Sequence, residues 1–255
     1  MKDLVKSELS RIFARRKTVI LFIIFILLTI FDSMFIHYYG QAIFNRQGDT
    51  AVLTPHNFPV ALGKEVFLIL HFLIFPILFI DSFSVELSDG SYRLVMTKPI
   101  SRMHLLLSKW ISQMIILLLF FVTIIVVAYS YALLFIDSSS ATMFLHPTKE
   151  YSVLDAFIFT IKFYAFLFLV SCTVLMITSF IAFFIHPILS YIVTVGILIA
   201  AVFVHDVFRF FLIPGEEVLR IVHEQDITFL ILTTFMITVG LLVNSLAWNK
   251  RDIYL

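Results

Sequence analysis

The sequence has few charged residues for its length. Only 14% of its 255 residues are charged and 61% are hydrophobic, which gives a mean hydropathy of +1.04. A soluble domain carries about a quarter charged residues and about half apolar ones. This composition excludes a soluble globular enzyme and indicates a chain that is surrounded by lipid.

Cysteine, excess positive charge and glycine-rich loops are also lacking. Cys172 stands alone in an apolar run, which excludes an intramolecular disulfide framework and a cysteine metal cluster. The 18 basic and 17 acidic residues leave a charge of +1, so nucleic acid is not expected as a partner. No two of the seven glycines are spaced as in G-x-G, and Gly63-Lys64 is followed by Glu65. Without a phosphate-binding loop, any use of nucleotide energy requires another chain.

Catalytic and metal-binding motifs are incomplete. No two of the eight histidines are spaced four residues apart, and His223-Glu224 is followed by Ile227 where a zinc protease needs its second histidine. Glu216 and Glu217 resemble the glutamate pair of CAAX-type membrane proteases, but only two residues separate them from Arg220 instead of three. We therefore expect neither a catalytic nor a metal site, and an intramembrane protease stays an alternative.

Long apolar runs dominate the rest of the chain. A helix that crosses a bilayer needs about 20 apolar residues. The fourth and fifth runs follow each other closely, and Pro187 favours a tight turn between them. The sequence therefore predicts an all-α polytopic membrane protein, one domain over 1–255, whose first span is retained and not cleaved as a signal peptide. The six expected spans are 19–39, 66–84, 110–135, 156–181, 187–205 and 227–248.

The basic residues are distributed unequally between the two sides. With six spans, 12 of the 18 basic residues fall on the side of the termini, 5 fall on the other side, and Lys162 lies within a span. Lysine and arginine are concentrated in cytoplasmic segments of membrane proteins. This bias predicts a multi-pass protein with both termini in the cytoplasm.

The segment 1–17 has an amphipathic, basic pattern. Val5, Leu9, Ile12 and Phe13 recur at helical spacing, and five basic residues occupy much of the remaining circumference. Such a helix is suited to lie on an anionic lipid surface. The alternative is that its charges only fix the orientation of the chain.

Two connections between spans carry further patterns. The segment 85–109 has a turn signal at Asp89-Gly90 and a possible helix cap at Ser101, and it predicts a short helix that docks on a cytoplasmic partner. The segment 206–225 continues the apolar pattern up to Pro214-Gly215 and then returns, which predicts a hairpin that dips into the outer leaflet. For the segment 85–109, the alternative is that its charges only fix the topology of the chain. For the segment 206–225, the alternative is an amphipathic surface loop.

Three stretches resemble the permease subunits of ABC transporters of the ABC-2 type, which have the type V exporter fold. They are the basic N-terminal helix, the segment from Glu86 through Asp89-Gly90-Ser91 and Thr97-Lys98-Pro99-Ile100-Ser101-Arg102 to Lys109, and the tail Trp248-Asn249-Lys250-Arg251-Asp252-Ile253. With six spans, the similarity covers the whole chain.

The resemblance implies an elbow helix at 2–17, a coupling helix within 87–98 and a re-entrant hairpin at 207–224. It implies a bacterial plasma membrane location and two partners, a cytoplasmic ATPase that binds ATP and Mg, and a second copy or a related permease. The cargo would be hydrophobic or amphipathic, such as a peptide antibiotic, a drug or a lipid. A sensor or scaffold that transports nothing stays an alternative. The implied ATPase-coupling residues are Glu86, Asp89, Gly90, Arg93, Pro99, Ser101, Arg102 and Lys109, and those of the hairpin are Pro214, Gly215, Glu216 and Glu217.

Overall fold

The computed structural model describes residues 1–43, 50–85, 101–137, 152–224 and 226–250. Six of its helical stretches are long and apolar enough to cross a membrane, which confirms the prediction of a helical, multi-pass membrane protein. The stretches are α2 (Arg16–Tyr39), Phe58–Ser84, α7 (Arg102–Phe135), α8 (Val153–Phe184), α9 (Pro187–Val204) and Ile227–Trp248 within α11 (Ile227–Lys250).

The second span is built from four helical pieces in succession. These are α3 (Phe58–Ile69), the π-helical turn η1 (Leu70–Ile74), α4 (Phe75–Ile80) and the π-helical turn η2 (Asp81–Val85). The remaining elements are α1 (Lys2–Ala14), the 3-10 helix η3 (Asp206–Phe211), α10 (Pro214–Glu224) and two short antiparallel strands, β1 (Gln41–Ile43) and β2 (Thr50–Val52). The strands add a small hairpin to the all-helical architecture that the sequence predicts.

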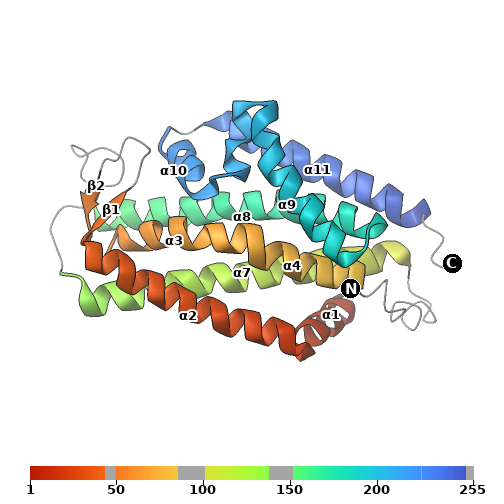
Figure 1. The fold of residues 1–255 in the computed structure, drawn as a ribbon, viewed down its shortest axis with the longest axis horizontal. Coiled ribbons are helices and arrows are strands. Elements are labelled where there is room, and N and C mark those ends of the chain that lie inside the picture. The colour runs from red at the N-terminus through yellow and green to blue at the C-terminus, as the bar shows by residue number, and fades with distance from the viewer. Residues whose placement is uncertain (44–49, 86–100, 138–151, 225, 251–255) are drawn as a thin grey trace.

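The N-terminal helix and the end of α11 lie at one end of the helical bundle. Figure 1 shows α1 and the end of α11 at this end, with the β1–β2 hairpin at the opposite end. An even number of spans requires this arrangement. We call the end that carries α1 the terminal end, and the end that carries β1 and β2 the hairpin end.

The second span and α8 form the centre of the bundle. In the apolar, membrane-spanning part of each of these two helical stretches, 72% of the residues are buried, against 22% in α2 and 17% in both α9 and α11. The apolar outer faces of these three helices are suited to face lipid. Aromatic rings pack between the second span and α7, where Phe75 contacts Phe120 and Phe121 edge to face.

Two helix ends follow local signals in the sequence. The residue Gly40 ends α2 in the left-handed conformation, φ +67°, which costs a residue without Cβ little. The fourth and fifth spans are joined by a tight turn, because α8 ends at Phe184 and α9 begins at Pro187. This turn confirms the predicted break between the two spans.

The predicted start of the second span is wrong by eight residues. The helix begins at Phe58 and not at 66, after a turn in which the side chains of Thr54 and Asn57 each accept a hydrogen bond from the other's backbone N–H. Lys64 and Glu65 lower the local hydropathy, which explains the error. Lys64 is therefore a buried residue of the span and does not belong to the preceding connection.

Candidate functional site

The residues that the sequence singles out for ATPase coupling are only partly within the described structure. Glu86, Asp89, Gly90, Arg93 and Pro99 lie outside the described residues. Ser101, Arg102 and Lys109 are described, and so are the residues that flank the 86–100 connection on both sides. The surroundings of these flanks define the candidate site.

The N-terminal helix is shorter than predicted, and its inward face includes Glu8 and leaves Phe13 out. It ends at Ala14, because Arg15 is extended with ψ 116°, and Arg16 and Lys17 begin α2. Its buried residues are Glu8 and Ile12, whereas Phe13, assigned to the apolar face from the sequence, is 47% exposed. The helix packs along α7, where the Ser112 hydroxyl donates to the Val5 carbonyl. Its inward face therefore carries a charge.

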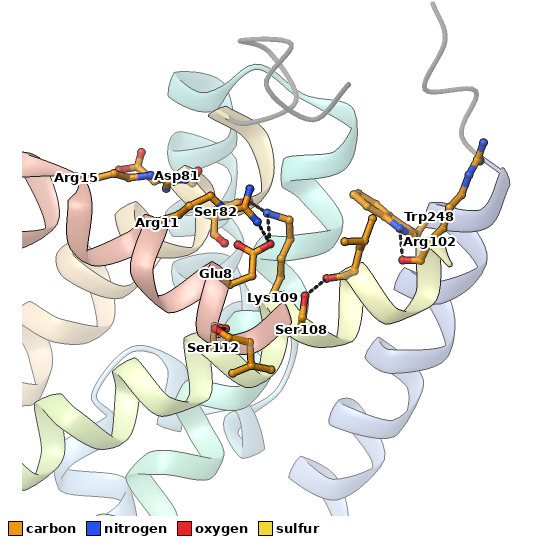
Figure 2. Close-up of polar contacts among 12 residues, drawn as sticks. Glu8, Arg11, Arg15, Asp81, Ser82, Arg102, Ser108, Lys109, Ser112 and Trp248 are labelled. Atoms are coloured by element: carbon orange, nitrogen blue, oxygen red, sulfur yellow. Dashed lines mark hydrogen bonds and ion pairs between the residues drawn. The ribbon is translucent and has the colours of Figure 1, made fainter. Parts of the chain in front are cut away.

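Glu8 is the centre of a buried charged cluster (Figure 2). Its carboxylate accepts a hydrogen bond from Arg11 and lies 3.7 Å from the Lys109 ammonium of α7. The Lys109 ammonium also donates to the Ser82 carbonyl of η2 at 2.8 Å. The side chains of Glu8 and Lys109 are only 2% and 1% exposed. Opposite charges at such burial stabilise a structure only as a pair, because each alone would lose its hydration without compensation.

A second group of contacts surrounds Asp81, the first residue of η2. Its carboxylate accepts a hydrogen bond from the Lys17 ammonium of α2 at 2.9 Å. Its backbone carbonyl accepts a hydrogen bond from the Arg15 guanidinium at 3.0 Å. The turn between α1 and α2 is thus fastened to the last turn of the second span.

The start of α7 is fastened to the last span. The Ser101 side chain caps the helix by accepting from the His104 backbone N–H, which confirms the predicted cap. The indole N–H of Trp248 in α11 donates to the Arg102 carbonyl at 2.9 Å. Trp248 is 1% exposed and packs against Phe183. The beginning of α7 is therefore connected to both ends of the chain.

We call the charged part of this region the terminal cluster. Its members come from α1, α2, η2 and α7, so they lie on both sides of the 86–100 connection along the chain. A displacement at either flank of this connection must change these contacts or move α1. The members are Glu8, Arg11, Arg15, Lys17, Asp81, Ser82 and Lys109.

The predicted hairpin residues lie in a separate place. η3 and α10 form a helix, turn and helix, and Figure 1 shows α10 beside α8, within the length of the bundle. A Cβ on Gly215 would lie 2.6 Å from the Lys64 carbonyl, so only glycine allows this approach of α10 to α3. Pro214 is the first residue of α10, where a missing N–H costs nothing.

The two glutamates of the hairpin have different partners. Glu216 lies 3.6 Å from the Lys64 ammonium, and Glu217 accepts two hydrogen bonds from the Arg220 guanidinium. Partial burial opposes the charge of Arg220, but the hydrogen bond and the charges of Glu217, Glu224 and Asp226 raise its pKa above the usual value. Both glutamates thus belong to ion pairs that hold the hairpin.

No protein-family profile and no curated protein sequence matches this chain. Among the described residues, no three histidine, cysteine, aspartate or glutamate side chains are grouped as metal ligands. Its function is therefore inferred from its sequence and from the geometry of the bundle.

Proposed function

We propose that this chain is the membrane-spanning permease subunit of an ATP-driven exporter of the ABC-2 type. A cytoplasmic ATPase would bind and hydrolyse ATP, and this chain would couple hydrolysis to export of a hydrophobic or amphipathic cargo. The observation that carries the proposal is the terminal cluster. It joins α1 to both flanks of the connection on which the ATPase would dock.

The position of the terminal cluster suits this role. A docking partner that moves the 86–100 connection acts first on η2 and on the start of α7. Asp81 and Ser82 belong to η2, and Lys109 belongs to α7, so their ion pairs and hydrogen bonds to α1 and α2 carry the displacement into the first three spans. In this proposal α1 is the elbow helix, and both termini lie in the cytoplasm.

Two further features fit the proposal. The η3–α10 hairpin has the helix–turn–helix form of a re-entrant segment, and it packs against α3 and α8. The exposed apolar faces of α2 and α9 leave room for a second copy or a related permease, the assembly that such an exporter requires. The cargo pathway would form between the two subunits.

The test is purification of the tagged full chain from native membranes in mild detergent. Co-purifying chains are identified by mass spectrometry, and vanadate-sensitive ATPase activity is measured. Arg102→Glu reverses a charge at the proposed docking site. Arg209→Glu is the matched control, because Arg209 is ion-paired to Asp206 in η3, far along the chain from that site.

We expect an ATPase subunit with the wild-type protein and with Arg209→Glu, and its loss with Arg102→Glu. Thermal stability in detergent should be similar for the two variants, which separates loss of docking from loss of folding. Absence of any ATPase from the wild-type preparation, or equal recovery with both variants, contradicts the proposal.

A further inference from the structure

The second span departs from regular α-helical geometry in two places. In η1 the Phe75 N–H bonds to the Leu70 carbonyl, five residues earlier, and η2 forms a second π-helical turn. Such turns hold an extra residue and occur frequently at functional sites. Between them lies only α4, so any change of the π-helical geometry acts on a short segment of six residues.

A proline explains the first of these turns. Pro76 has no N–H, so it cannot donate to the Phe72 carbonyl one helical turn earlier. The Tyr191 hydroxyl of α9 donates to this carbonyl at 3.0 Å instead. The fifth span is therefore joined to the second span at the point where the second span's own hydrogen bonding is interrupted.

His71 joins the hairpin to the same point. Its Nε2 lies 2.9 Å from the Phe211 carbonyl of η3, and since a carbonyl only accepts, Nε2 carries the proton. The ring is fully buried, and Nδ1 has no hydrogen-bond donor among the described residues. A buried acceptor that lacks a donor lowers stability. A side chain that only filled space would not impose this cost.

These contacts form what we call the proline junction, which consists of His71, Phe72, Pro76, Tyr191 and Phe211. The junction lies at η1 and connects the second span to α9 and to the η3–α10 hairpin. At the other side of α4, η2 carries Asp81 and Ser82 of the terminal cluster. One short helix thus separates the contacts of the hairpin from the contacts of α1.

We propose that His71 is a positioning residue that couples the hairpin to the terminal cluster through the second span. If a π-helical turn moves along the helix, the residues that it passes advance by about 1.5 Å and rotate by about 100°. A shift that begins at Asp81 and Ser82 therefore changes the direction of His71 and its bond to Phe211. Its role in a transport cycle rests on the proposed function, whereas the coupling itself does not.

The first test measures hydrogen exchange of the α10 amides in the full-length protein in nanodiscs, without nucleotide. His71→Leu should raise their exchange rate at least about five-fold, whereas His71→Gln, which keeps a donor for Phe211, should stay within about two-fold of wild type. Asn244→Leu is the matched control. It removes another buried hydrogen bond to a backbone carbonyl, that of Met176, with no contact to the junction.

The second test measures coupling over the length of α4. Asp81→Asn removes the ion pair with Lys17, and we expect about five-fold faster α10 exchange in the wild-type background and no further change in the His71→Leu background. If His71→Leu does not fold, Tyr191→Phe replaces it as the second background for Asp81→Asn.

Equal effects of Asp81→Asn in both backgrounds, or unchanged α10 exchange in every junction variant, would overturn the inference. Neither result depends on an ATPase. A negative result in these two tests would therefore leave the proposed function unaffected. Conversely, a result that contradicts the proposed function would not show whether His71 couples the hairpin to the terminal cluster.

Discussion

At the terminal end of the bundle, helices are joined largely by charged side chains, whereas around the η3–α10 hairpin close packing accompanies the Lys64–Glu216 ion pair. Glu8 and Lys109 form a buried ion pair at the terminal end. At the η3–α10 hairpin, Gly215 lies directly on the backbone of Lys64 in α3, and the neighbouring Gly63 of α3 lies against the Tyr164 ring of α8. Close packing permits few arrangements, whereas polar contacts can be exchanged for others. The difference assigns the larger rearrangement to the terminal end and the smaller one to the hairpin.

Among the variants that test this difference between the two regions, Lys109→Met is expected to lower the free energy of unfolding most. Removal of Lys109 takes the buried cationic partner from the Glu8 carboxylate, which keeps only its contact with the more exposed Arg11, and breaks the hydrogen bond to the Ser82 carbonyl, at a cost of up to about 3–5 kcal/mol of unfolding free energy. Equilibrium unfolding in mixed micelles measures the loss. The double variant Glu8→Leu with Lys109→Met should recover most of it, because neither buried charge remains. Lys162→Met, at an exposed position of α8, is the control.

If Lys109→Met destabilises no more than Lys162→Met, the buried ion pair does not hold the terminal end. If the double variant is as unstable as the single one, the cost does not come from an unpaired charge. Either result would remove the distinction between the two regions.

The second-largest loss of stability is expected from a variant that disturbs close packing at the hairpin. Gly215→Ala would place a Cβ 2.6 Å from the Lys64 carbonyl, so α10 must move, at a cost of about 1–3 kcal/mol. Amide exchange in α10 should become faster. Gly196→Ala is the matched control, because a Cβ there meets nothing within 4 Å and adds helix propensity. Equal behaviour of the two variants would show that the hairpin tolerates displacement.

A smaller effect is expected from Trp248→Phe. A smaller aromatic ring replaces the indole and the hydrogen bond from Trp248 to the Arg102 carbonyl is lost, and the loss of this bond costs about 1 kcal/mol. Thermal unfolding of the detergent-solubilised protein measures the change. Trp110→Phe is a suitable comparison, since its indole N–H lies 3.4 Å from the Ser179 hydroxyl and makes a weaker bond. A larger loss from Trp110→Phe would contradict this ranking.

The smallest effect is expected from Lys17→Gln. The Lys17 side chain is 58% exposed, so its ion pair with Asp81 contributes less than about 1 kcal/mol and weakens as salt is added. Unfolding measured at low and high salt should show the wild-type and variant proteins converging. A difference that is large or independent of salt would mean that this pair is shielded from solvent.

Much of the fold was predictable, because long apolar runs allow few structures in a bilayer. The turn at Pro187 and the Ser101 cap are local signals that the structure confirms. The start of the second span was missed because Lys64 and Glu65 interrupt the hydropathy. The structure explains why Lys64 is tolerated in the span, since Glu216 from a distant part of the chain lies beside it.

The candidate site was less predictable. Glu8 does not belong to the apolar stripe predicted for its helix, and its buried partner Lys109 lies 101 positions away, so no local pattern reveals the pair. The two π-helical turns leave no mark in the hydropathy of the second span. Pro76 was the one local signal of an interruption there, and it does not indicate that Tyr191 and His71 meet at that point.

The most direct test of the proposed coupling is nucleotide-dependent hydrogen exchange in α10, measured on the purified complex of this chain with its ATPase in nanodiscs. ATP with vanadate should change α10 exchange in the wild-type complex. The double variant Glu8→Leu with Lys109→Met should still bind the ATPase and show no such change. If α10 exchange is unaffected by nucleotide in the wild type, or responds equally in the double variant, the terminal cluster does not couple ATP hydrolysis to the membrane spans.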